Sequence, residues 1–169
     1  SKKFKSLKFY LGIVPKGTSR EALQFLIDNN IETWIFCTSD QIMFHPKIYF
    51  FQGKHNYRFI TGSSNLTSFG LFDNIEASTF FEFSKNNQQG KKLVRQFEEY
   101  FDPILNGTDK NVQKLTTEVL VDLEQSGFIW PESKTNAEYE FVKSNKKAFD
   151  KRKKLKFDKD SLGKIESKP

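Results

Sequence analysis

The residues that could act on a phosphate ester lie between His45 and Glu76. His45 and Lys47 are two positions apart in the segment Phe-His-Pro-Lys. Side chains two residues apart on an extended strand point to the same face, so this spacing places an imidazole beside an ammonium. Ser63 and Asn65 repeat the spacing in the segment Gly-Ser-Ser-Asn. An imidazole can attack phosphorus or move protons, an ammonium supplies a permanent charge, and hydroxyl and amide groups donate hydrogen bonds to phosphate oxygens.

These groups can act together only if the strands that carry them are paired. The apolar segment from Met43 to Gln52 precedes the turn sequence Gly-Lys-His-Asn and a second strand from Tyr57 to Thr61, which predicts a hairpin. The hairpin brings the His-x-Lys segment beside the Ser-x-Asn segment only if the strand curves and the loop 62–65 folds back. From spacing alone, a chance His-x-Lys pair and an ordinary polar turn explain the pattern as well.

The complete pattern is similar to the active-site signature of the phospholipase D superfamily. It reads Phe-His-Pro-Lys-Ile-Tyr-Phe-Phe, then Gly-Ser-Ser-Asn-Leu-Thr-Ser-Phe-Gly-Leu, then Asn74-Ile75-Glu76. It resembles most the bacterial nuclease branch, which contains phospholipase D-type restriction endonucleases and related nuclease domains attached to helicases. The resemblance extends from about Leu7 to Phe101. It implies a phospholipase D-like α/β fold, with one mixed sheet flanked by helices.

The resemblance also implies a role for each candidate residue. His45 corresponds to the family's nucleophilic or acid/base histidine, and Lys47 to its phosphate-binding lysine. Ser63 and Asn65 correspond to the polar residues of the Gly-Ser-x-Asn segment, and Glu76 to the carboxylate that orients the histidine. Attack by the imidazole on phosphorus forms a phosphohistidine, while a second histidine protonates the leaving oxygen and later activates water. This mechanism requires no metal ion or other cofactor.

The chain carries one copy of the signature, whereas the mechanism uses two histidines. Family members with one copy pair two chains so that both motifs meet, which implies a homodimer. The chain departs from the pattern at Gln52, where many members have an aspartate five positions after the lysine. Nuclease members of this branch often lack that aspartate, so the departure disfavours a lipase. The expected function is metal-independent hydrolysis of DNA, double-stranded in the simplest case, by a restriction-type endonuclease.

Three other functions stay open. The domain could be a non-catalytic module that binds nucleic acid or dimerises within a larger protein, or a lipid-cleaving or phospholipid-synthesising member of the superfamily. The third is a metal-dependent nuclease, because Asp122 and Glu132-Ser133-Lys134 imitate the carboxylate pattern of Mg²⁺ enzymes. The other reactive side chains favour structural roles, since His55 lies in the predicted hairpin turn and Cys37 follows a predicted strand.

The elements around these residues predict an α/β domain. An apolar strand from Leu7 to Val14 precedes a helix that begins at a Thr18…Glu21 capping box and ends at Asn29-Asn30. A strand over 31–36 follows, and two strands joined by a helix usually lie parallel. The remaining elements expected are a strand over 77–83, a helix over 91–101 with Leu93, Val94, Phe97, Tyr100 and Phe101 facing inward, and a helix over 115–125 that ends at Gly127.

Composition limits the class of protein. The chain has 169 residues, enough for one domain, and no apolar stretch long enough to span a bilayer. Its single cysteine cannot form an internal disulfide or a cysteine-based zinc site, which favours a reducing, cytoplasmic location. No membrane partner is expected.

The net charge of +6 belongs to the two ends of the chain. Residues 1–8 carry a net +4 and residues 132–169 a net +5, whereas residues 9–131 carry a net −3. The change in charge predicts that the domain covers 1–131. The resemblance implies that this is a nuclease domain, and that it lacks the family's N-terminal strand and helix. A basic extension over 132–169 follows, helical to 150 and then disordered, as a solvated tail, a DNA-attracting tail or a linker to a further domain.

Overall fold

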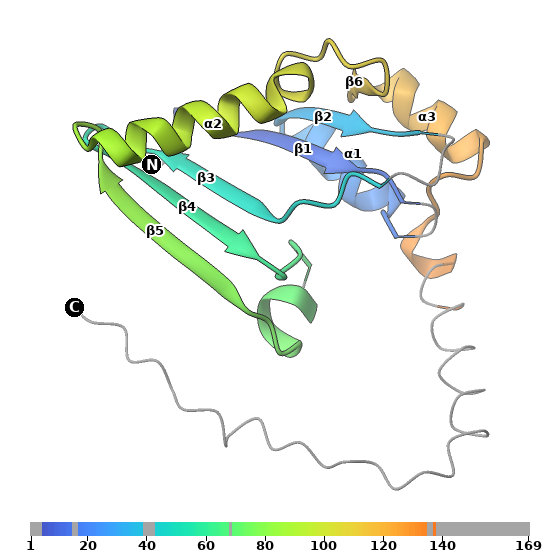
Figure 1. Cartoon of the computed structure of the whole chain (residues 1–169). Coiled ribbons are helices and arrows are strands. Elements are labelled where there is room, and N and C mark those ends of the chain that lie inside the picture. The colour runs from blue at the N-terminus through green and yellow to red at the C-terminus, as the bar shows by residue number, and fades with distance from the viewer. Residues whose placement is uncertain (1–4, 15–16, 39–42, 68, 135–136, 138–169) are drawn as a thin grey trace, which may run out of the picture. The chain divides into compact units, whose positions relative to one another are not determined.

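The computed structural model describes residues 5–14, 17–38, 43–67, 69–134 and 137 (Figure 1). The chain divides into two units, Ser1–Glu132 and Ser133–Pro169, and every element named below belongs to the first. Apart from residues 132–134 and 137, the predicted basic extension lies outside the described residues. The order is β1 (Lys8–Gly12), α1 (Arg20–Asp28), β2 (Glu32–Phe36), β3 (Ile48–Gln52), β4 (Asn56–Gly62), η1 (Phe69–Asp73, a π-helix), β5 (Ser78–Ser84), α2 (Gln88–Leu105), β6 (Val112–Lys114) and α3 (Thr117–Gln125).

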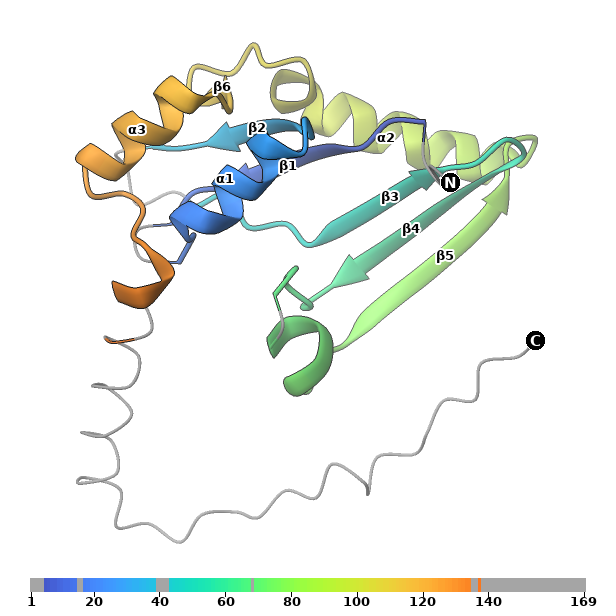
Figure 2. The same cartoon turned by 180° about the vertical axis from the view of Figure 1, so that it is seen from behind.

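The first sheet has the strand order β1-β2-β6. β1 and β2 pair in parallel, with Leu11 opposite Ile35, which confirms the predicted strand–helix–strand unit. β6 pairs antiparallel with β2; its three residues, Val-Gln-Lys, are too few to produce a periodic pattern. Behind the sheet, α1 lies against β2 and α3 (Figure 2). The core between these elements consists of Ile13, Leu23, Ile35, Leu115, Leu120, Leu123 and Ile129.

The start of α1 differs from the predicted capping box. Ser19, rather than Thr18, is the N-cap residue, and its hydroxyl accepts a hydrogen bond from the Ala22 amide at 3.2 Å. The backbone explains the shift, because the Arg20 amide donates to the Trp130 carbonyl at 3.0 Å and holds Ser19 extended. The predicted end is confirmed, since Asn29 is the C-cap residue and Asn30 adopts a left-handed φ of 52°.

The second sheet, β3-β4-β5, is antiparallel throughout. The predicted hairpin is confirmed, with Phe50 opposite Phe59. α2 runs along this sheet (Figure 1), and the Phe97 ring lies 5.6 Å from the Phe50 ring and 5.4 Å from the Phe59 ring. Gly90 of α2 allows the close approach, because a Cβ there would lie 2.0 Å from the Phe83 ring. Four phenylalanines, Phe50, Phe59, Phe83 and Phe97, therefore form a second, aromatic cluster between α2 and this sheet.

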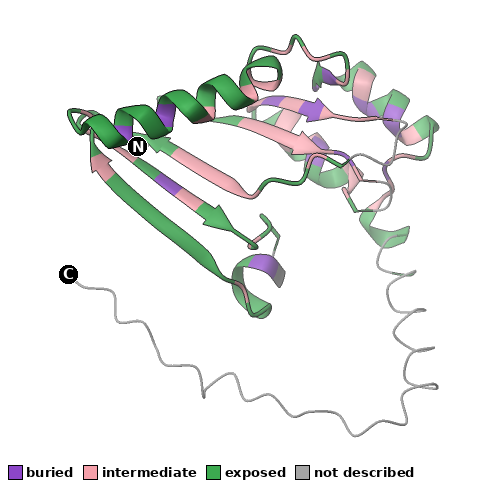
Figure 3. Ribbon diagram, in the orientation of Figure 1, coloured by how far each residue is buried: buried purple, intermediate pink, exposed green. Residues whose placement is uncertain are grey.

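The helix α2 is longer than predicted, and its inner face is narrower. Its N-cap is Asn87, whose side chain accepts from the Gly90 amide at 2.8 Å. Val94 is buried as expected, but Tyr100 is 78% exposed. Residues 90, 94, 97 and 101 follow one helical stripe, and Tyr100 lies one position off that stripe. Leu93 is also more exposed than predicted, and Figure 3 shows the outer face of the helix in green.

The expectation of one mixed sheet is wrong for the described residues, because the strands form two separate sheets. The division follows from the segment 43–47, which belongs to no strand. Its Phe44 carbonyl approaches Gly12 so closely that a Cβ on Gly12 would lie 2.0 Å from that oxygen. β3 consequently begins at Ile48, after the predicted His-x-Lys pair. The α/β class is confirmed, and no described helix is long and apolar enough to cross a membrane.

Candidate active site

His45 and Lys47 lie together immediately before β3. His45 is exposed, and Lys47 is half-buried. The Lys47 Nζ lies 2.5 Å from Nδ1 and 2.9 Å from Nε2 of the His45 ring. A neutral imidazole has one acceptor nitrogen, so the ammonium can donate to only one of the two. The side chains of His45 and Lys47 therefore lie next to each other, as predicted, although the backbone that carries them is not a strand.

The end of β4 reaches this pair and brings Ser63 with it. Ile48 and Thr61 are opposite each other in the hairpin, and the next amide, of Gly62, donates to the Lys47 carbonyl at 3.4 Å. Ser63 then bonds to the segment before β5. Its amide donates to the Ala77 carbonyl at 3.0 Å, and its hydroxyl accepts from the Ala77 amide at 3.1 Å. The loop 62–65 is thus tied to the segment before β5, and the Gly62 amide joins the end of β4 to the backbone of Lys47.

Glu76 completes the cluster through Ser63. The Ser63 hydroxyl donates to one carboxylate oxygen, and the Asn74 amide donates to the other at 3.1 Å. These two hydrogen bonds, with a further contribution from the positive charge of Lys47, hold the pKa of Glu76 below its ordinary value. Of these causes, the hydrogen bond from Ser63 is the largest and the charge of Lys47 the smallest.

Two predicted residues differ from the pattern implied by the resemblance. Within the described chain, Glu76 makes no hydrogen bond to His45, because its oxygens accept from Ser63 and Asn74 instead. Asn65 is exposed, and its backbone packs against Gly70, where a Cβ would lie 2.5 Å from the Asn65 carbonyl oxygen. Its side chain forms no hydrogen bond within the described residues, so it remains available to a ligand.

Four supporting residues were given no role by the sequence: Tyr49, Ser64, Asn74 and Ser78. The Tyr49 hydroxyl donates to the Ser64 carbonyl at 2.9 Å, and burial raises the pKa of this phenol. The Ser64 hydroxyl also lies 2.9 Å from the Ser78 hydroxyl. Asn74 holds Glu76, as described above. The signal for Tyr49 was its position two residues after Lys47, which places it at the same end of the sheet.

The other reactive residues have the structural positions that the sequence favours. His55 is exposed in the hairpin turn. Cys37 is half-buried against the first core, and burial raises the pKa of its thiol, which disfavours the nucleophilic thiolate. Gln52 ends β3, far along the strand from Lys47.

The pattern of a metal-dependent nuclease does not form a site in the described part of the chain. Asp122 lies exposed on α3, whereas the Glu132 carboxylate accepts from the Ser19 hydroxyl at 3.2 Å. Across residues 5–134, excluding the gaps, no three His, Cys, Asp or Glu side chains are close enough to hold a metal ion. Asp122 and Glu132 therefore supply no ion site of the kind that chemistry requires.

The lowered pKa of Glu76 predicts a contribution to stability that depends on pH. A carboxyl group whose pKa is lower in the folded chain stabilises the fold above its unfolded pKa, and this contribution is lost as the pH falls through the folded pKa. Glu76→Gln is expected to lower the melting temperature at neutral pH, and the difference should vanish well below pH 4.5, the ordinary pKa of this group. Thermal unfolding of both proteins at neutral and acidic pH measures this difference in melting temperature. Glu98→Gln, on the exposed face of α2, removes the same charge; an equal loss in both variants would contradict a specific role for Glu76.

Neither the models of known protein families nor the curated proteins yield a match to this chain.

Proposed function

We propose that this chain is a phospholipase D-type nuclease that hydrolyses phosphodiester bonds of DNA without a metal ion. One observation carries the proposal: the His45 imidazole, the Lys47 ammonium, the Ser63 hydroxyl and the Glu76 carboxylate gather at one end of the β3-β4-β5 sheet. These four groups come from three segments, each more than ten residues from the next, and each group is a type that phosphoryl transfer uses. The resemblance to the phospholipase D signature supports the same chemistry.

The contact between Lys47 and His45 suggests how the phosphate starts the reaction. In the free protein the ammonium occupies the acceptor nitrogen of the imidazole. A phosphate oxygen is a stronger partner for an ammonium, because the hydrogen bond is then between two charged groups. Binding of the diester would draw the Lys47 Nζ onto the phosphate and free the lone pair of His45. Asn65 would donate to a remaining non-bridging oxygen, and Ser63 would do so by turning its single O–H from Glu76 to the phosphate.

The freed His45 nitrogen then attacks phosphorus, and the bond from phosphorus to the leaving oxygen breaks. The leaving oxygen takes a proton from a second, protonated imidazole, which becomes neutral. Water next attacks the phosphohistidine, gives its proton to that neutral imidazole and releases His45. Each step conserves protons only if a second histidine is present. His55 is at the opposite end of the hairpin, so the second imidazole would be the His45 of another copy of the chain.

The surface beside the site supports such a homodimer. Four large apolar side chains are exposed between Ser63 and Glu76, in the loop that contains η1. We name this group the apolar loop: Leu66, Leu71, Phe72 and Ile75. Exposed apolar clusters of this kind commonly mark protein contacts. A second copy packed here would cover the loop and bring the two His45 side chains toward each other.

The substitution Phe72→Asp tests this contact. Phe72 is 80% exposed, so the change should not disturb folding of the single chain. We expect it to convert the dimer to a monomer, measured by light scattering, and to lower the cleavage rate at least about tenfold. Phe25→Asp is the matched control, because Phe25 is 60% exposed and lies on α1, which packs against the β1-β2-β6 sheet, whereas the apolar loop joins β4 to β5. A fully active monomer would refute the requirement for two histidines.

The direct test of the proposed function is incubation of the chain with duplex DNA in excess EDTA, followed by gel analysis. Cleavage that persists in EDTA supports the proposal. Binding without cleavage would favour the non-catalytic module, and cleavage that EDTA abolishes would favour the metal-dependent alternative. Release of the headgroup from phospholipid vesicles, with no action on DNA, would favour a lipid-cleaving member.

A further inference from the structure

Lysine side chains gather at the opposite end of the β3-β4-β5 sheet from the candidate site. The hairpin turn before β4 meets the turn after β5, because the Lys85 amide donates to the His55 carbonyl at 2.9 Å. α2 begins three residues after Lys85, at the same end (Figure 1). This arrangement collects four lysines from three segments of the chain. We name them the basic end: Lys54, Lys85, Lys91 and Lys92.

The charge of the basic end is not neutralised by nearby acids. Residues 83–97 contain four cationic side chains and no acidic one. Lys54, Lys91 and Lys92 are exposed and form no ion pair within the described residues. Lys85 Nζ lies 5.1 Å from the centre of the Tyr57 ring, a contact that leaves its charge in place.

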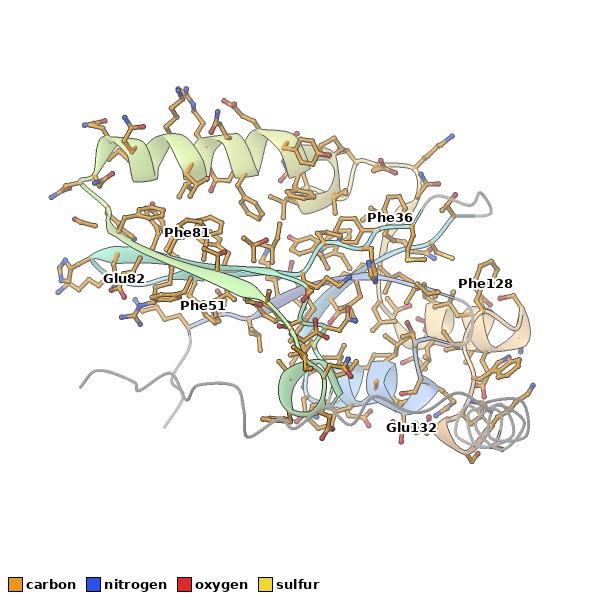
Figure 4. The ribbon with its side chains drawn as sticks, turned by 60° about the horizontal axis from the view of Figure 1, so that its bottom comes forward. Phe36, Phe51, Phe81, Glu82, Phe128 and Glu132 are labelled. Atoms are coloured by element: carbon orange, nitrogen blue, oxygen red, sulfur yellow. The ribbon has the colours of Figure 1, made fainter. Side chains whose placement is uncertain are left out.

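The neighbouring arginines differ, since each has an acidic partner. Arg58 pairs with Glu82 of β5, labelled in Figure 4, at 3.1 Å, and Arg95 pairs with Glu99 at 3.5 Å. The uncompensated positive charge therefore belongs to the lysines.

The lysines of α2 are placed against the helix dipole. The N-terminus of a helix carries partial positive charge and favours acidic side chains, and cations there destabilise the helix. α2 has no acid in its first turn and carries Lys91 and Lys92 close behind it, whereas its acids, Glu98, Glu99 and Asp102, lie in its second half. Helix stability does not explain this reversed order. A feature that breaks a local stability rule is expected where the protein needs it for binding.

We propose that the basic end binds the phosphate backbone of DNA, at a distance from the bond that is cut. The identity of the polyanion rests on the proposed function. β4 has seven residues, and a strand rises about 3.3 Å per residue, so the two ends of the sheet are about 20 Å apart. Phosphates along one strand of DNA recur about every 3.4 Å. One duplex could therefore contact both ends, with about six nucleotides between the scissile phosphate and the lysines.

A membrane surface fits the basic end less well. Peripheral membrane binding combines cations with apolar side chains that enter the lipid. Of the large apolar residues that the described chain exposes, Leu93 lies beside Lys92 and Phe51 lies three residues before Lys54, and they are only 38% and 40% exposed. Backbone binding to nucleic acid needs only the cations.

The test measures the affinity of the full chain for a fluorescent duplex of about 20 base pairs, by anisotropy over a range of salt concentrations. A His45→Ala background keeps the duplex intact. Neutralising Lys91→Gln and Lys92→Gln together should weaken binding about tenfold at low ionic strength and reduce the slope of log K against log salt by about two. The matched control is Lys110→Gln with Lys114→Gln, an equal charge change on exposed residues next to and within β6. It should change the affinity less than about twofold.

The outcomes separate this inference from the proposed function. Equal weakening by both pairs would overturn the inference, because general charge would then explain binding. If the Lys91→Gln and Lys92→Gln changes abolish binding to anionic vesicles but leave duplex binding unchanged, the inference would be overturned in favour of a membrane partner. If wild-type protein cuts no DNA but its duplex binding depends on these lysines, the proposed function fails and the inference stands. Circular dichroism checks that the variant pair folds; relief of the dipole conflict should leave α2 at least as stable.

Discussion

His45→Ala is expected to abolish EDTA-resistant cleavage of DNA, with a fall in rate of about 10³-fold or more. Two roles are lost at once in the proposed dimer, since each His45 is the nucleophile for one chain and the proton donor for the other. Binding of DNA should be retained, because Lys47 and the basic end remain. The rate is measured from single-turnover cleavage of a labelled duplex, and the affinity from anisotropy.

His55→Ala is the matched control for this substitution. It removes the only other histidine of the chain, which is equally exposed but lies in the hairpin turn. It should leave the cleavage rate within about twofold of wild type. Both variants should melt at the wild-type temperature, because neither imidazole is buried. Unchanged cleavage by the His45→Ala protein would assign the activity to a contaminant or to another site and would refute the mechanism.

Gly62→Ala is expected to lose most of the activity while the domain still folds. A Cβ at this position would lie 2.2 Å from the Ala77 carbonyl oxygen and 2.6 Å from the Ser78 Cα, which are backbone atoms and cannot rotate away. β4 and β5 must therefore separate next to Ser63. Overpacking of this kind costs about 1–3 kcal/mol of unfolding free energy. A displacement of about 1 Å at a reacting group can lower the rate about a hundredfold.

Gly17→Ala supplies the comparison for a glycine without such a contact. Among the described residues, the nearest atom to a Cβ at Gly17 would be the Cβ of Val14 at 3.4 Å, and the φ of Gly17 is not in the left-handed region. The same substitution there should leave stability and activity close to wild type, or raise stability slightly through the unfolded state. Urea unfolding measures the stability of both variants, and the duplex cleavage assay measures their activity. Wild-type cleavage by Gly62→Ala would contradict the placement of Ser63 and Glu76 at the site.

The sequence predicted the elements well where apolar segments were bounded by clear turn residues. β1 and β2 follow from two short apolar segments with an amphipathic helix between them, and the hairpin follows from its turn. Prediction from the sequence failed where a single tertiary contact decided the boundary of an element. Ser19 replaced Thr18 as a cap because Trp130, more than a hundred residues away, bonds to the first turn of α1. Tyr100 was assigned to the core because one position on a helix cannot be distinguished from the next by apolar character alone.

The candidate site was predicted as a set of residues but not as a set of contacts. Residue types and spacing singled out His45, Lys47, Ser63 and Asn65, and the resemblance to the phospholipase D signature added Glu76. They did not indicate that Glu76 accepts from Ser63 and Asn74 rather than from His45, nor that Tyr49 holds the Ser64 carbonyl. Such hydrogen bonds depend on how two strands and a loop meet in space, which the order of residues along one strand does not specify.

By itself, the sequence determined which chemical groups the chain can offer to a phosphate and that its middle carries a net −3 charge. Only the tertiary structure decided where those groups lie. Antiparallel pairing carries β4 back to the start of β3, and the backbone bonds of Gly62 and Ser63 close the loop onto β5. The same pairing brings two turns and the start of α2 together at the other end, where four lysines form a positive surface in a domain that is acidic on average. Net charge sums over the whole chain, whereas a ligand responds to the charges that folding places next to it.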